Sequence, residues 1–397
     1  MSISKNVGGV PALLTKIRIK KTYKRSNNCI KRFFNKVPLI GKPIVSLAHN
    51  IKRSIKQLVI PNMYFEDIGF TYLGPVDGHN IDELEKILEQ SKHLEGPILI
   101  HVITKKGKGY RFAEETPDKF HGISSFDIKT GEKTSKSKKD YSKVFGDKLI
   151  ELASKNDRIV AVTAAMKDGT GLKELANKFP NRFFDVGIAE QHAVGMIAGM
   201  AASGLKPVFA VYSSFLQRGY DQLIHDVALE NIPVTICIDR AGIVGADGET
   251  HQGIFDLCFL NSIPNLIVIA PKDFKELEHM LEFAINLNKP VIIRYPRGGE
   301  GTEKFEQHND IELGESEIIK EGKDLSIIAI GKMVERAQEI ANLLEKENIN
   351  AEVINARFLK PLDKETILKS AKKTRNVVTI EDGLIEGGLR SICYRGN

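Results

Sequence analysis

The chain has 397 residues, of which 42% are hydrophobic and 27% charged, and its formal net charge is +6. This length predicts two or three domains with ample core, and the composition is that of a soluble globular protein rather than a disordered or fibrous one. Four scattered cysteines without metal-ligand or disulfide spacing, and a start without an apolar signal core, favour a cytoplasmic setting.

The first 60 residues are strongly basic. They hold fourteen Lys or Arg and no Asp or Glu, so the remainder of the chain carries a net charge of −8. A nucleic-acid or membrane-surface arm is one interpretation. A solvated helical excursion of a larger domain is favoured, because the basic residues alternate with Ile, Leu and Val and no aromatic stacking platform is evident. We therefore expect neither nucleic acid nor membrane as a partner.

From Phe65 onward the pattern is that of an α/β domain. It predicts a charged amphipathic helix at Asp82–Ser91 and a buried strand at Pro97–Thr104. The strand leads into Lys-Lys-Gly-Lys-Gly-Tyr at 105–110, and loops at the carboxyl ends of strands are where α/β sheets bind ligands. Without further context, a solvated Lys/Gly turn is the simpler interpretation of this loop.

A Lys/Ser/Thr-rich run predicts a linker at 129–140, which leaves 1–128 as the first domain. A second α/β domain is expected at 141–300. Its alternating strands and helices imply a mostly parallel, twisted sheet with helices on both faces. The expected strands are Arg158–Thr163, Pro207–Tyr212, Pro233–Asp239, Leu266–Ala270 and Pro290–Tyr295, and the expected helices are 142–154, 171–178, Gly219–Asn231 and 273–287.

The stretch Arg182–Gly204 reads as a short strand, a turn at Gly187 and a helix of Ala, Gly, Val, Ile and Met. Such a helix is apolar on every side, so we expect it to be buried, and it is too short for a membrane span. Glu190 in its first turn would need a partner or a proton when buried, which makes it the first candidate for chemistry. A favourable contact with the helix dipole is the alternative. His192 is more simply a satisfied core residue.

Polar residues collect in the loops that follow the predicted strands. Three arginines, one aspartate and one histidine are expected to converge near Glu190. Guanidinium groups suit a phosphate or carboxylate, and a His beside an Asp suits proton transfer. These residues are Arg218, Arg240, Arg297, Asp247 and His251.

A linker at 301–314 precedes a third, smaller α/β domain at 315–397. Its predicted strands are Leu325–Ile330, Ala351–Asn355 and Asn376–Ile380, and its predicted helices are Val334–Glu347 and Lys364–Lys373.

Taken together, these motifs resemble the 1-deoxy-D-xylulose-5-phosphate synthases, thiamine-diphosphate enzymes of the transketolase group. The resemblance runs nearly the whole length. It starts at Met-Ser-Ile-Ser and passes through Gly-Pro-Val-Asp-Gly-His, Lys-Lys-Gly-Lys-Gly-Tyr, Asp-Val-Gly-Ile-Ala-Glu-Gln-His, Gly-Ala-Asp-Gly-Glu-Thr-His-Gln-Gly, Tyr-Pro-Arg-Gly and Glu-Asp-Gly. It implies a transketolase-like multi-domain α/β fold.

The family decarboxylates pyruvate on thiamine diphosphate and joins the two-carbon unit to glyceraldehyde 3-phosphate, feeding isoprenoid, thiamine and pyridoxal synthesis. The resemblance implies that Glu190 hydrogen-bonds the aminopyrimidine of the cofactor. It implies further roles for residues matched one by one. Phe215 and Tyr110 would contact the cofactor, His121 and His251 would face the substrate with Tyr212 and Asp247 as polar partners, and Arg218, Arg240 and Arg297 would clamp the phosphate.

Two departures from the family pattern shape the expectation for this chain. The Gly-Asp-Gly motif that holds Mg²⁺ and the diphosphate is not in the sequence, and Glu386-Gly-Gly leads into Leu389-Arg390-Ser391 instead of Phe-Gly-Ser. We therefore expect a fragment without metal ligands of its own, inactive by itself and part of a homodimer. A dehydrogenase E1 β-type or transketolase half-subunit is one alternative, and a non-catalytic remnant or a basic binder is another.

Overall fold

The computed structural model describes residues 63–117, 119–121, 123, 125–134, 139–305 and 310–395. The chain forms two compact units, one ending at Lys136 and the other beginning at Ser137, and each is described by itself. The division falls within the predicted 129–140 linker. The basic helical excursion predicted at 1–60 lies outside the described residues.

The first unit is built on two parallel strands and one amphipathic helix. Leu73, Val76 and Ile87 form its small core, and the Asn80 side chain caps the helix by accepting from the Glu83 N–H at 3.1 Å. Its elements are α4 (Met63–Asp67), β1 (Thr71–Asp77), α5 (Ile81–Ser91), β2 (Ile98–Ile103) and α6 (Arg111–Glu115).

The buried strand predicted at Pro97–Thr104 is β2, but it is only half-buried. Val102 is 39% exposed and Ile103 38% exposed. Among the described residues β2 pairs only with β1, so its apolar run meets no second strand on the other edge. The apolar pattern thus predicted the strand correctly and its burial wrongly.

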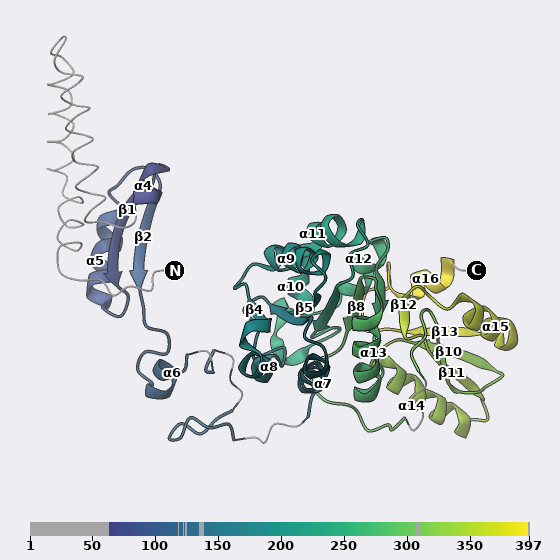
Figure 1. Ribbon diagram of the computed structural model, residues 1–397. Helices are drawn as coiled ribbons and strands as arrows, with labels where there is room; N and C mark the ends of the chain where they lie inside the picture. Colours follow the sequence, from purple (N-terminus) through teal and green to yellow (C-terminus); the bar gives the residue numbers. More distant parts are fainter. Residues whose placement is uncertain are drawn as a thin grey trace, which may run out of the picture. The chain divides into compact units, whose positions relative to one another are not determined.

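A seven-stranded sheet forms the centre of the second unit (Figure 1). Its order is β12-β7-β8-β6-β5-β3-β4, and every pairing is parallel except that of β12 with β7. The central strands are continuous apolar runs because helices cover both of their faces. The strands are β3 (Ile159–Thr163), β4 (Phe183–Asp185), β5 (Lys206–Tyr212), β6 (Thr235–Asp239), β7 (Ile267–Ile269), β8 (Val291–Arg294) and β12 (Phe358–Lys360).

Each face of this sheet has its own hydrophobic cluster. On one face Phe145 and Leu281 pack with inward-pointing strand residues, and on the other face Ile197 and Leu257 do the same. The predicted doubly covered α/β sheet is therefore confirmed. The helices are α7 (Tyr141–Lys155), α8 (Lys173–Lys178), α9 (Glu190–Ala202), α12 (Asp256–Ser262) and α13 (Phe274–Asn286), with a short turn η1 at Pro180–Arg182.

The single helix predicted at Gly219–Asn231 is broken into short segments. A π-helical turn occupies Leu223–Ala228, and π turns occur mostly as local bulges within helices. No sequence period distinguishes such a turn from the α-helix that was predicted. The segments are α10 (Ser213–Leu216), η2 (Gln217–Gly219), α11 (Tyr220–Gln222) and η3 (Leu223–Ala228).

The C-terminal part of the second unit has a four-stranded sheet of order β13-β10-β11-β9. Strand β9 is antiparallel to its neighbour and the other pairings are parallel. β12 leaves this part and extends the seven-stranded sheet. The elements are β9 (Glu317–Lys320), β10 (Leu325–Ala329), α14 (Met333–Lys346), β11 (Ala351–Asn355), α15 (Lys364–Thr374), β13 (Val377–Ile380) and α16 (Leu389–Arg395).

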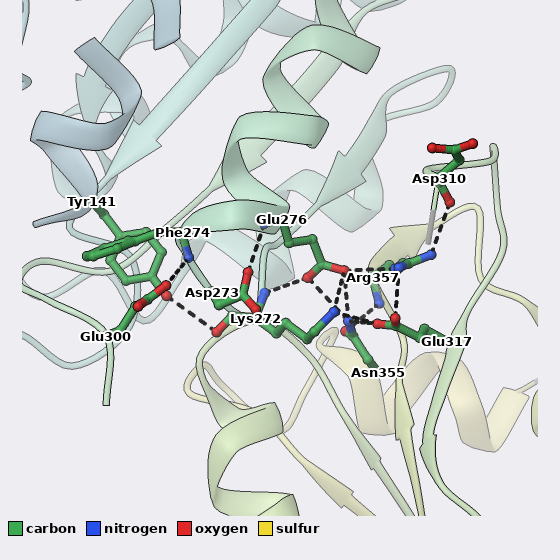
Figure 2. A network of polar contacts seen from close by, with 10 residues as sticks. All are labelled: Tyr141, Lys272, Asp273, Phe274, Glu276, Glu300, Asp310, Glu317, Asn355 and Arg357. Carbon is green, nitrogen blue, oxygen red and sulfur yellow. Dashed lines mark hydrogen bonds and ion pairs between the residues drawn. The ribbon is translucent and has the colours of Figure 1, made fainter. Parts of the chain in front are cut away.

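A buried polar network joins the two sheets of the second unit (Figure 2). The Lys272 Nζ lies 2.6 Å from Glu317 Oε2, and the Arg357 Nε donates to Glu276 Oε1 at 2.8 Å. Asn355 Nδ2 also donates to Glu276 Oε1, at 3.0 Å. Buried charges are tolerated only when each is paired, so this network requires the two sheets to dock in one arrangement.

No helix in the described ranges combines the length and the apolar character needed to cross a membrane.

Candidate functional site

Three neighbouring parallel strands place their carboxyl ends along one edge of the seven-stranded sheet. Tyr212 ends β5, Asp239 ends β6 and Arg294 ends β8. The loops that follow these strands carry the candidate site residues. Because such loops share one edge of a parallel sheet, ligands bind there in α/β proteins.

Glu190 lies beside this edge as the first residue of α9. Gly187 makes the preceding turn with φ +71°, and the Asp185 carboxylate accepts the Gly187 N–H at 3.0 Å. Glu190 is 2% exposed, and its Oε1 accepts from Arg218 Nη1 at 3.2 Å. Gly219 lets the Arg218 segment approach α9, since a Cβ at Gly219 would lie 2.9 Å from Val194 Cγ2. The buried carboxylate therefore has a cationic partner.

The rest of α9 differs from the sequence expectation. One face is buried, through residues such as Val194 and Ile197, but Gln191, His192 and Gly199 are exposed. The prediction of a helix buried all round, with His192 in the core, was therefore wrong. Gln191 and His192 are polar and Gly199 has no side chain, so leaving this face in water exposes little apolar area.

An aromatic group lies next to the Glu190–Arg218 pair. The Phe215 ring stacks on Tyr212 with centroids 5.8 Å apart, and the edge of His251 meets Phe215 at 5.2 Å. The Arg218 guanidinium carbon lies 5.3 Å from the Phe215 ring centroid. Phe215 thus lies among three side chains that can hydrogen-bond to a ligand, namely Tyr212, His251 and Arg218.

The arginines at 240 and 297 meet on one carboxylate. Arg240 Nε donates to Asp247 Oδ2 at 3.1 Å, and Arg297 Nη1 donates to Asp247 Oδ1. Arg240 also lies over the Tyr212 ring at 3.8 Å and donates to Asp239 Oδ1 at 3.1 Å. Its backbone has φ +61°, a conformation that costs energy in non-glycine residues and gathers at functional sites.

The expected pairing of His251 with Asp247 is not found. His251 Nδ1 instead lies 2.9 Å from Thr250 Oγ1, while Asp247 accepts from the two arginines. The physical reason is charge, because two guanidinium groups that donate charge-assisted hydrogen bonds already occupy both oxygens of the Asp247 carboxylate. The structure therefore gives His251 and Asp247 other hydrogen-bond partners, and their roles in proton transfer stay predictions.

Burial changes the acid–base properties of two groups in the site. It raises the pKa of Asp239 to about 6, against the opposing effect of Arg240 and a hydrogen bond from Ser142. It also raises the pKa of the Tyr212 phenol, again against Arg240. Tyr212 therefore stays a neutral hydrogen-bond donor at neutral pH.

The two site residues predicted in the first unit lie in a different setting. Tyr110 packs in an aromatic cluster with Phe112, Phe120 and Phe126, and its hydroxyl donates to the Ile128 carbonyl at 2.9 Å. His121 is exposed. Their roles beside the cofactor and substrate stay predictions.

Sequence reasoning did not single out Asp239, Asp256, Arg294 or Asp382. The available signal was a charged residue at the end of an apolar strand, as in Val-Ile-Ile-Arg294, because charged residues are rarely fully buried unless they are paired. Across the described ranges, no three His, Cys, Asp or Glu side chains are grouped as they would be to hold a metal ion.

Three family models match the chain in sequence order. The 1-deoxy-D-xylulose-5-phosphate synthase model covers residues 1–104. The pyrimidine-binding domain of transketolase covers 137–299, and the transketolase C-terminal domain covers 314–393.

Known proteins show the same similarity. The chain is 52% identical over 391 residues to the 1-deoxy-D-xylulose-5-phosphate synthase of Caldanaerobacter subterraneus subsp. tengcongensis, with 98% of this chain and 63% of the relative covered. It is 50% identical over 393 residues to that of Clostridium acetobutylicum, covering 99% of this chain and 63% of the relative. A solved structure, described as a split gene transketolase, inactive beta4 tetramer, matches with TM-score 0.60 and 34% identity, over 65% of this chain and 83% of that one. The chain thus spans somewhat less than two thirds of the length of these synthases.

Proposed function

Because the chain belongs to the 1-deoxy-D-xylulose-5-phosphate synthase family of transketolase-type enzymes, we propose that its second unit forms the pyrimidine side of a thiamine-diphosphate site. The whole reaction would release carbon dioxide from pyruvate and join the remaining two-carbon unit to glyceraldehyde 3-phosphate. The proposed setting is the cytoplasm.

The observation that carries the proposal is the buried Glu190 carboxylate beside Phe215 and Arg218. A carboxyl group at the start of a helix and next to an aromatic ring fits an aminopyrimidine, because one proton held between the acid and a ring nitrogen makes a hydrogen bond while the face of the pyrimidine lies against Phe215. When bound, thiamine diphosphate supplies the electron sink for the carbon chemistry. Glu190 would hold the pyrimidine nitrogen, and Phe215 would fix the plane of the ring.

The arginines give the site its proposed phosphate specificity. Arg240 and Arg297 share the Asp247 carboxylate, and the Arg297 side chain is 40% exposed. A tetrahedral phosphate can present two of its oxygens to each guanidinium group and carries more negative charge than a carboxylate, so it can compete with Asp247 for both arginines. The neutral Tyr212 phenol would donate to the substrate at the same edge. His251, which contacts the Phe215 ring, would face the substrate.

We further propose that the working enzyme is a homodimer completed by Mg²⁺ and a diphosphate-binding part. The exposed face of α9, with Gly199 open to solvent, allows another backbone to approach closely, and Ile188 and Leu229 are 74% and 56% exposed. The name of the split transketolase describes a tetramer of β chains as inactive, which supports the expectation that these units do not turn over alone.

Turnover by a reconstituted enzyme tests the proposal. The purified chain would be mixed with a polypeptide spanning the part of the Clostridium acetobutylicum synthase that this chain does not match, with Mg²⁺, thiamine diphosphate and both substrates. We expect 1-deoxy-D-xylulose 5-phosphate from the mixture and not from either part alone. Glu190→Gln should abolish the product, while Glu230→Gln, an exposed residue after η3, should not. Equal product from the Glu190→Gln mixture would rule out the assigned role.

A further inference from the structure

A buried ionic triad lies beneath the loop that carries Asp247 and His251. Arg294 ends β8 and is 3% exposed. Its Nε donates to Asp256 Oδ2 at 3.0 Å and its Nη1 to Asp382 Oδ1 at 2.8 Å. Asp256 begins α12, and Asp382 follows β13 in the C-terminal part. One guanidinium therefore bridges two carboxylates that are far apart in sequence.

The triad contacts the loop that follows β5 and the loop that follows β6. Ser213, which follows Tyr212, donates its hydroxyl to Asp256 Oδ2 at 3.2 Å. On the other side, a Cβ at Gly242 would lie 2.0 Å from Asp382 Oδ2. Gly242 has φ +77°, so both its conformation and its distance from Asp382 require a residue without a side chain.

Gly242 and Gly253 form the neck of the loop between them. Each donates its N–H to the carbonyl of the other at 2.8 Å. The segment after β13 also binds next to this neck, since the Leu384 N–H donates to the Ile254 carbonyl at 3.1 Å. The neck is thus held by its own two hydrogen bonds and by the segment that carries Asp382. Asp247 and His251 lie within the loop that this neck closes.

The energetics favour a positioning role over simple stabilisation. A buried ion triad contributes little net stability compared with apolar residues of the same shape, and Arg294 Nη2 has no hydrogen-bond partner within the described residues. A functional loop, by contrast, gains from supports that fix it to within a fraction of an ångström.

We propose that Asp382, through Arg294 and Asp256, positions the neck of the 242–253 loop and so sets the placement of Asp247 and His251 in the candidate site. Asp382 and Arg294 are positioning residues, because they act through the loop. The inference rests on the proposed function for its meaning, but the geometry of the loop can be tested without turnover.

Hydrogen exchange of the purified chain, read by mass spectrometry over peptides from 240–254, tests the inference. Asp382→Asn keeps the shape of the side chain and removes its charge. We expect about tenfold faster exchange at the neck, the size expected from losing one charge-assisted hydrogen bond, with unchanged exchange in β3 and β5. Glu317→Gln is the matched control, because it weakens the other buried network between the sheets (Figure 2) and should leave the neck unchanged.

Three results would overturn the inference. One is exchange at the wild-type rate in the neck of Asp382→Asn. Another is equally fast exchange in Glu317→Gln, which would show that the two sheets dock less tightly in general. If Asp382→Asn does not fold, Arg294→Lys replaces it, because this variant keeps the positive charge but loses the two-pronged guanidinium group. Global unfolding of both variants would show a purely structural role.

In the reconstituted enzyme, Asp382→Asn should raise KM for glyceraldehyde 3-phosphate about tenfold and leave KM for pyruvate unchanged. Because exchange needs no substrate, failure of the proposed function would leave that measurement interpretable.

Discussion

The buried carboxyl of Asp239 should make folding stability depend on pH in a defined direction. Asp239 is 0% exposed. Its carboxyl oxygens accept hydrogen bonds from Ser142 Oγ at 2.6 Å and from Arg240 Nη1 at 3.1 Å. Burial raises its pKa from the ordinary 3.8 to about 6. Because the folded state holds the proton more tightly, the protonated carboxyl contributes stability that is fully present below the unfolded pKa and is lost as pH rises through the folded one.

The interval between these two pKa values corresponds to about 3 kcal/mol. The amide in Asp239→Asn cannot ionise, so the variant does not lose stability through this group as the pH rises. The free energy of unfolding of the variant should therefore gain about 3 kcal/mol relative to wild type between about pH 4 and about pH 7. A weaker hydrogen bond from the amide of Asp239→Asn would shift the difference in unfolding free energy by the same amount at every pH. It would not change how that difference varies with pH.

Urea unfolding followed by far-UV circular dichroism at four or more pH values in this range measures the difference. Asp147→Asn, on the exposed face of α7, controls for the loss of one negative charge at the surface. A difference between Asp239→Asn and wild type that is constant with pH would refute the assignment of a raised pKa to this buried group.

Three further predictions concern the phosphate site, the packing behind it and the core. Arg297→Met should weaken inorganic phosphate binding about tenfold or more, through loss of a charged donor, as measured by calorimetry; unchanged affinity would place the phosphate elsewhere. Gly169→Ala should lower the melting temperature, because a Cβ there would lie 1.7 Å from the Tyr212 hydroxyl; a melting temperature equal to that of wild type would contradict this contact. Ile197→Ala in the fully buried face of α9 should cost about 2–5 kcal/mol of unfolding free energy, and a cost below about 1 kcal/mol would show that this face is not packed as described.

Much of the architecture follows from local patterns. The apolar runs of β3 and β6 and the amphipathic period of α13 predicted their positions within a residue or two. They suffice because a strand covered on both faces must be apolar throughout. The π turn at Leu223–Ala228 was not predicted, because it depends on a local bulge of the backbone. The strand β2 was predicted but its partial exposure was not, because exposure depends on which strands pair.

The candidate site, too, could be predicted only in part from local sequence patterns. The types of residue at strand ends indicated which side chains gather, but not which pairs form. Asp247 pairs with Arg297, fifty residues later in sequence, and that choice depends on competing charges rather than on spacing. The contact of Asp382 with Arg294 joins positions 88 residues apart, which no local period encodes.

The affinity of the reconstituted chain for thiamine diphosphate tests the central claim most directly. Calorimetry in the presence of Mg²⁺ would compare wild type with Glu190→Gln, after melting curves establish that both are folded. We expect the variant to bind the cofactor about tenfold to a hundredfold more weakly, because it loses a charged hydrogen bond in a buried setting. Equal affinities would contradict the assignment of Glu190 as the group that holds the pyrimidine.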